Sequence, residues 1–153
     1  MRTGLLSRAL VSGTLAAAAV TIAASLAGRR ASGSSAAALN ATSHFLWGER
    51  SGRQDEYSAK YTGVGFIANH GASIFWALFY EALGRKTSAR RALLDGGLIA
   101  ALAYVTDYHV VPRRLTPGFE MRMPRAALAA VYAALALGLS LRDLCSSAFP
   151  REA

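Results

Sequence analysis

Four long, mostly uncharged stretches alternate along the chain with short stretches in which the charges gather. We place them at about residues 9–28, 61–83, 92–111 and 126–141. Most are close to the length of about 20 residues that a helix needs to cross a bilayer. A soluble helix carries polar residues every three or four positions, whereas whole turns of these stretches carry none. The pattern predicts an all-α integral membrane bundle of four transmembrane helices, with residues 1–153 forming one domain.

The first stretch is open to two interpretations. Ser25-Leu26-Ala27 resembles a signal-peptidase site, which would make residues 9–28 part of a cleaved signal peptide. The apolar run is longer than the usual core of such a peptide, and Arg29-Arg30 follows it directly. We therefore expect an uncleaved first span. Its many Ala, Gly, Ser and Thr residues suit close contacts with other helices.

Residues 31–48, which follow the first span, are uncharged, but only half of them are apolar. Helical spacing places Asn40, Ser43, His44 and Trp47 on one stripe and more apolar residues on the other. This pattern predicts a short amphipathic helix over about residues 35–48, lying in the membrane interface. The alternative is a re-entrant helix that dips into the bundle and turns its polar stripe inward.

Polar residues within the predicted spans are the candidate functional residues, because ionisable groups at membrane depth are costly and commonly functional. In the third span, Gly96, Ala100 and Ala103 form a seam of small residues that leads to Asp107. Such seams face neighbouring helices. The pattern therefore predicts that Asp107 points into the bundle.

Asn69-His70 lies at the centre of the second span. A short turn joins the second and third spans, so we expect them to pack as antiparallel neighbours. In that arrangement His70 lies level with Tyr104 and within one helical turn of Asp107. The resulting hypothesis is an intramembrane polar cluster of His70, Tyr104, Asp107 and Asn69.

Two further residues, Asn40 and His44, would support this cluster if the helix at 35–48 entered the bundle. The cluster has two interpretations: a hydrogen-bond network that holds the helices together, or a proton or ion relay or ligand pocket. A metal would need His44, His70 and Asp107 to converge, which we do not expect.

The net charge of +8 comes mainly from Arg residues beside the apolar runs. Basic residues in this position contact anionic lipid headgroups, so we expect membrane lipids as partners and no nucleic acid. The basic residues are divided almost evenly between the two sides, so their count does not decide the orientation. Cys145 is the single cysteine, which excludes an internal disulfide. The sequence contains none of the phosphate-loop, HExxH, GxSxG or CxxC motifs. We expect no cofactor, no bound metal and no catalytic residue.

Three stretches together resemble a group of small uncharacterised proteobacterial inner-membrane proteins. They are Asn40-Ala-Thr-Ser-His-Phe-Leu-Trp-Gly48, Asn69-His70 with the aromatic residues that follow it, and Tyr104-Val-Thr-Asp-Tyr-His109 with the Pro-Arg-Arg stretch after it. The resemblance covers roughly residues 36–141. It implies a multi-pass protein of the bacterial inner membrane with a helical architecture, and it implies no chemistry.

We therefore expect a non-enzymatic structural, interaction or accessory component of the inner membrane, which forms a homo-oligomer or binds a membrane-protein partner. A second hypothesis is a small oligomeric transporter or proton- or ion-conducting protein that uses His70 and Asp107. A third is a membrane-embedded enzyme that acts on an apolar or lipid substrate.

Overall fold

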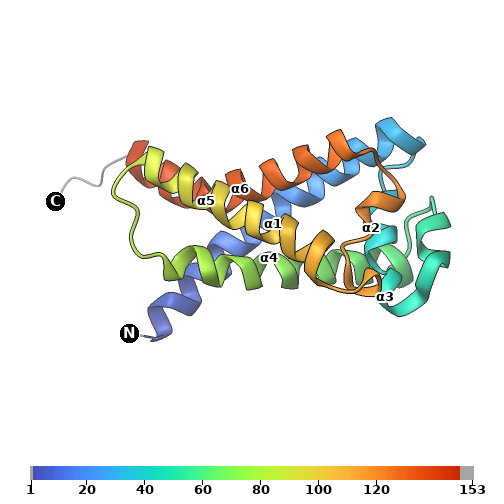
Figure 1. The fold of residues 1–153 in the computed structure, drawn as a ribbon, viewed down its shortest axis with the longest axis horizontal. Coiled ribbons are helices and arrows are strands. Elements are labelled where there is room, and N and C mark those ends of the chain that lie inside the picture. Colours follow the sequence, from blue (N-terminus) through green and yellow to red (C-terminus); the bar gives the residue numbers. More distant parts are fainter. Residues whose placement is uncertain (1, 149–153) are drawn as a thin grey trace.

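The computed structural model describes residues 2–148, and within them the chain forms helices and no strand. Four long helices run side by side along the molecule (Figure 1). They are α1 (Arg2–Ser32), α4 (Val64–Ala82), α5 (Ala89–Val105) and α6 (Arg125–Ala148). The predicted all-α fold is confirmed.

The short elements connect the long helices. They are α2 (Ala37–Thr42), α3 (His44–Trp47), η1 (Gly48–Arg53), η2 (Ala59–Gly63), η3 (Thr106–Val110), η4 (Arg113–Leu115) and η5 (Phe119–Met121). Of these, η2 and η3 are π-helical turns that extend α4 and α5.

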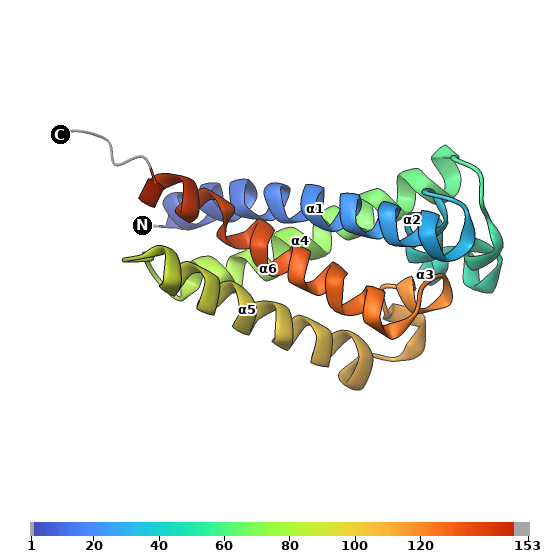
Figure 2. The same cartoon turned by 90° about the horizontal axis from the view of Figure 1, so that it is seen from above.

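Figures 1 and 2 show that the chain reverses direction at each connection between the long helices. The start of α1, the turn 83–88 and the end of α6 lie at one end of the bundle, which we call the terminal end. Residues 33–58 and 111–124 gather at the opposite end, which we call the connector end. The loops therefore lie at the two ends, and the long helices alone form the middle.

The segment expected to form one amphipathic helix differs from that expectation. The helix is broken at Ser43 into α2 and α3, and all six residues of α2 are buried. Gly65 explains part of this burial, because a Cβ at that position would lie only 1.8 Å from the backbone oxygen of Leu39. The absent side chain allows α2 to lie directly against α4. Residues 36–44 are buried, whereas Leu46 and Trp47 at the end of the segment are 51% and 40% exposed.

Helix α1 is central to the packing. It contacts both α4 and α6 along much of its length, whereas α5 packs against α6 and contacts α4 much less. Small residues permit the close approach. A Cβ built on Gly13 would lie 2.6 Å from the Cα of Ile74, and one on Gly138 would lie 2.5 Å from the Cα of Ala16. Contacts between small residues are typical of helices that pack within membranes.

The long helices bury small and polar side chains and expose large apolar ones. The buried face of α4 carries Gly65, Asn69, Ser73, Ala77, Tyr80 and Glu81. Its exposed large apolar residues are Phe66, Ile67, Phe75 and Phe79, and those of α5 are Leu93, Leu94, Leu98, Leu102 and Val105. Soluble monomers rarely expose apolar surface that is continuous over so large an area.

Two helices are long and apolar enough to cross a membrane: α1 over Gly4–Ser32 and α6 over Arg125–Ser146. The other two do not meet the same standard of length and hydropathy. Helix α5 has 17 residues before its π-helical extension, and α4 carries Asn69, His70 and Glu81. Length and composition therefore identify two of the four predicted spans.

Candidate functional site

Asn40 and His44, the two supporting residues of the predicted cluster, hold the connector end together. The Asn40 amide nitrogen donates to the backbone oxygens of Gln54 at 2.9 Å and Glu56 at 3.0 Å. Its amide oxygen accepts from the Thr62 hydroxyl at 2.6 Å. His44 places one ring nitrogen 3.0 Å from the Arg113 backbone oxygen. Both residues therefore use their polar atoms to fix connectors.

The structure does not bring His70 together with Tyr104 and Asp107. His70 turns to the other side of α4, where its Nε2 lies 3.0 Å from the Thr14 hydroxyl on α1. The prediction assumed that α4 and α5 pack along each other. They contact each other little, because α1 and α6 are the main neighbours of α4 and α5 respectively.

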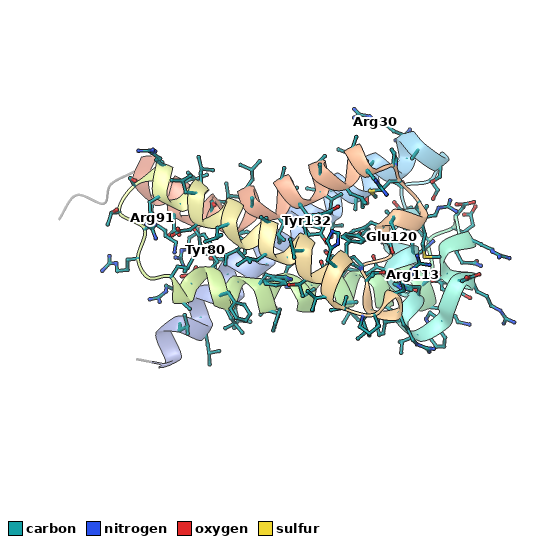
Figure 3. All side chains as sticks on the ribbon, in the orientation of Figure 1. Arg30, Tyr80, Arg91, Arg113, Glu120 and Tyr132 are labelled. Atoms are coloured by element: carbon teal, nitrogen blue, oxygen red, sulfur yellow. The ribbon has the colours of Figure 1, made fainter. Side chains whose placement is uncertain are left out.

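Asp107 does point into the bundle, as the seam of small residues predicted. Its Oδ2 accepts a hydrogen bond from the Tyr132 hydroxyl on α6 at 2.5 Å. The Tyr104 ring packs edge-on against the Tyr132 ring, with their centroids 5.3 Å apart, but 37% of Tyr104 is exposed. Figure 3 shows Tyr132 between the helices, away from both ends of the bundle. The partner of Asp107 is therefore a tyrosine that the sequence reasoning missed.

Asn69 and Asp107 both line a cavity of about 170 Å³. It is lined by residues of α1, α2, α3, α4, η3 and α6 and by the connector around Thr116. Its polar lining residues are Thr42, Asn69, Ser73, Asp107, Thr116 and Tyr132. Aromatic and aliphatic side chains, including Phe45, Trp76, Phe119 and Val131, form the rest of the wall. The cavity thus contains two of the four residues of the predicted cluster, and it is the candidate functional site.

The Asn69 side chain has a fixed orientation in this wall. Its amide nitrogen donates to the Ala17 backbone oxygen at 3.3 Å and to the Thr21 hydroxyl at 3.2 Å, both on α1. These two bonds use the donor capacity of the amide. Its oxygen has no donor among residues 2–148. Ser73, one turn further along α4, is also buried and lines the same cavity.

A second polar group, which we call the charged cluster, occupies the terminal end and comprises Arg8, Ser12, Glu81 and Arg142. Glu81 is buried and accepts from Ser12 Oγ at 2.6 Å and from Arg8 Nε at 3.1 Å. Arg142 Nη2 lies 3.2 Å from Oε1 and 3.3 Å from Oε2 of the same carboxylate. One acid of α4 therefore joins α1 and α6.

The basic turn at 85–91 and Tyr80 each pair with an acid other than Glu81. Lys86 of the turn forms an ion pair with Asp95 at 3.1 Å, and the Tyr80 hydroxyl donates to Asp143 at 2.8 Å. The charged cluster could have been predicted from the sequence. Arg8, Glu81 and Arg142 all lie at the ends of apolar stretches, and an antiparallel bundle brings these ends together.

Comparisons with protein-family models, with curated proteins and with solved structures give no match. Within the described part of the chain, no group of three or more His, Cys, Asp and Glu side chains is placed to hold a metal ion. The function must therefore be inferred from the geometry of the bundle and its cavity.

Proposed function

We propose that this chain is a multi-pass protein of the bacterial inner membrane that crosses the bilayer four times and serves as a non-enzymatic accessory component. The observation that carries this proposal is the distribution of side chains on α4. Phe66, Ile67, Phe75 and Phe79 face outward, whereas Asn69, Ser73 and Glu81 are buried. Asn69 is hydrogen-bonded to α1, and Glu81 to α1 and α6. A helix in water would be stabilised by the opposite arrangement.

The lengths of the middle helices support four crossings. With its π-helical extension, α4 runs from Ala59 to Ala82, and α5 runs from Ala89 to Val110. At 1.5 Å per residue each spans roughly 30 Å, which is about the thickness of the hydrocarbon core. The polar residues of α4 do not oppose insertion, because Asn69 and Glu81 have partners within the protein.

The ends of the bundle support contact with anionic lipids. Figure 3 shows Arg91 near the terminal end and Arg113 near the connector end. The side chain of Arg91 is 57% exposed although it pairs with Asp95. Basic residues at both ends of an apolar bundle are positioned to bind lipid phosphates.

The polar groups of the bundle support an accessory rather than a catalytic role. Asn40, Asn69 and Glu81 direct hydrogen bonds at other helices or connectors and hold them in place. The separation of His70 from Asp107 also removes the geometric basis of a relay that uses both. The bundle is best described as a scaffold that carries a cavity between its helices.

The number of times the chain crosses the membrane can be determined from the accessibility of single cysteines. In a Cys145→Ser background, single cysteines replace Arg53 at the connector end and Thr87 at the terminal end. Four crossings place these two positions on opposite sides of the membrane. A membrane-impermeant maleimide applied to intact spheroplasts will then label only one of them, and both after permeabilisation. The native Cys145, which is exposed at the terminal end, serves as a control and will follow position 87.

If only α1 and α6 cross, residues 33–124 lie together on one side. Positions 53 and 87 would then be labelled under the same conditions, and the four-span proposal would be rejected.

A further inference from the structure

The hydrogen-bonding groups that face the cavity are strongly unbalanced. The wall contains one carboxylate, Asp107, and no Lys, Arg or His. The Tyr132 hydroxyl donates to Oδ2 of Asp107. Within residues 2–148 no group donates to Oδ1 of Asp107. The Asn69 oxygen is also without a donor, since its amide nitrogen is directed at α1. The cavity therefore offers two free acceptor oxygens and a negative charge, and its hydroxyl groups, including that of Ser73, supply no positive charge.

Aromatic rings line the same space. Phe45, Trp76, Phe119 and Tyr132 come from four different elements and all contribute to the wall. The face of an aromatic ring attracts a cation, and Trp does so most strongly. Carboxylate, amide oxygen and aromatic rings together form an environment that suits a positively charged group attached to an apolar one.

The size of the cavity limits its ligand. A cavity of about 150 Å³ is large enough to bind benzene, so one of about 170 Å³ accommodates about six to eight non-hydrogen atoms. Leu115 lines the cavity although it is 60% exposed, so the wall at that point is thin and lies at the connector end. A small ligand can reach the cavity from this end.

We infer that the cavity binds a small organic ammonium ion with an apolar substituent. The ammonium group donates to Asp107 Oδ1 and to the Asn69 oxygen, and the substituent lies against Trp76 and Val131. An anion has no basic partner in this wall, and a neutral apolar molecule leaves both acceptors unpaired. The inference goes beyond the proposed accessory role and does not depend on how many helices cross the membrane.

The test compares three probes of the same shape and different charge: hexylammonium, hexanol and hexanoate. The chain has two tryptophans, Trp47 and Trp76. In the full-length Trp47→Phe protein in detergent, Trp76 is the single tryptophan and reports on the cavity by its fluorescence. We expect saturable binding of hexylammonium that is about tenfold tighter than that of hexanol, as for a charge-assisted hydrogen bond. We expect no saturable signal with hexanoate. Equal binding of hexylammonium and hexanol, or tighter binding of hexanoate, would overturn the inference. No residue that lines the cavity is substituted in this comparison.

Two substitutions then locate the charge. Asp107→Asn keeps an acceptor for Tyr132, and we expect it to lower the affinity for hexylammonium about tenfold, to that of hexanol. Asp143→Asn is the matched control, because Asp143 accepts from the Tyr80 hydroxyl at the opposite end of the bundle. It will leave the affinity unchanged. If Asp107→Asn folds and binds hexylammonium as tightly as the starting protein, the assignment of the site is wrong.

Discussion

At the scale of single residues, Glu81 shows how one buried acid joins three helices. Its side chain is only 3% exposed, and its two oxygens accept from α1 and α6. Arg8 and Arg142 are both partly exposed, so water solvates them in part, whereas Glu81 depends on its protein partners. The loss of this carboxylate would leave the Arg8 guanidinium without its acidic partner and Arg142 with Asp143 alone.

We predict that Glu81→Ala lowers the free energy of unfolding by about 3 kcal/mol, because removal of one member of a buried ionic group leaves charges without a partner. The measurement is reversible unfolding of the purified protein in mixed detergent micelles. Glu49→Ala is the control, since Glu49 pairs with Arg53 and both side chains are largely exposed. Exposed pairs contribute little. Equal losses for the two variants would show that the charged cluster does not hold the helices together.

Gly65 and Gly71 provide a second comparison at the residue scale, because both lie within α4. A Cβ on Gly65 would collide with the Leu39 backbone, whereas a Cβ on Gly71 meets no atom within 4 Å. We predict that Gly65→Ala lowers the melting temperature, since α2 must move away from α4. We predict that Gly71→Ala leaves it unchanged or raises it, because Ala favours a helix by about 1 kcal/mol over Gly. A fall for both variants would point to flexibility of α4 rather than close contact with α2.

At the scale of elements, α1 determines how the other helices are placed. It supplies Ser12 to Glu81, Thr14 to His70 and the Ala17 backbone oxygen to Asn69, so three levels of α4 are joined to it. The resemblance of Ser25-Leu26-Ala27 to a cleavage site therefore conflicts with the packing. Removal of residues 9–28 would leave His70 and Asn69 without these partners and Glu81 with Arg142 of α6 in place of Ser12.

We predict that α1 is retained in the mature protein. The intact mass of the protein purified after expression in a bacterium will include residues 9–28. A mass that corresponds to cleavage after Ala27 would contradict the packing of α1 as a permanent part of the bundle.

The positions of the long helices could be predicted from the sequence, since uncharged stretches mark them directly. The direction of Asp107 could also be predicted, because Gly96, Ala100 and Ala103 identify the packed face of α5. The hydrogen-bond partner of His70 could not be predicted from the sequence. Which helices are neighbours depends on how closely their backbones approach, and this is decided by contacts such as that of Gly13 with Ile74.

For a related reason the sequence did not predict the break at Ser43 or the loop that covers Asn40. The polar stripe of the segment at 35–48 suggested contact with water or headgroups, but the Asn40 side chain binds the backbone of the following loop. Periodicity shows which residues share a face of a helix. It does not show whether a loop from elsewhere in the chain covers that face.

At the scale of the whole molecule, the bundle combines a polar interior with an apolar exterior. Exposed Phe, Leu, Ile and Val side chains surround the middle of the long helices, and basic residues gather at both ends. In water this surface would cause association. In a bilayer the same surface contacts acyl chains, while the charged cluster and the cavity stay within the protein.

A four-helix membrane bundle requires that α4 and α5 face lipid as α1 and α6 do. Nitroxide labels at Phe75→Cys and Leu98→Cys, each in a Cys145→Ser background, test this directly in lipid bilayers. Both positions are about half exposed and lie on the outward faces. The measurement is the collision rate of each label with oxygen and with a nickel chelate. Oxygen concentrates in the hydrocarbon, whereas the nickel chelate stays in water. A label at Arg53→Cys gives the aqueous reference. We predict high oxygen and low nickel collision rates at 75 and 98. Nickel collision rates there as high as at position 53 would contradict a four-helix membrane bundle.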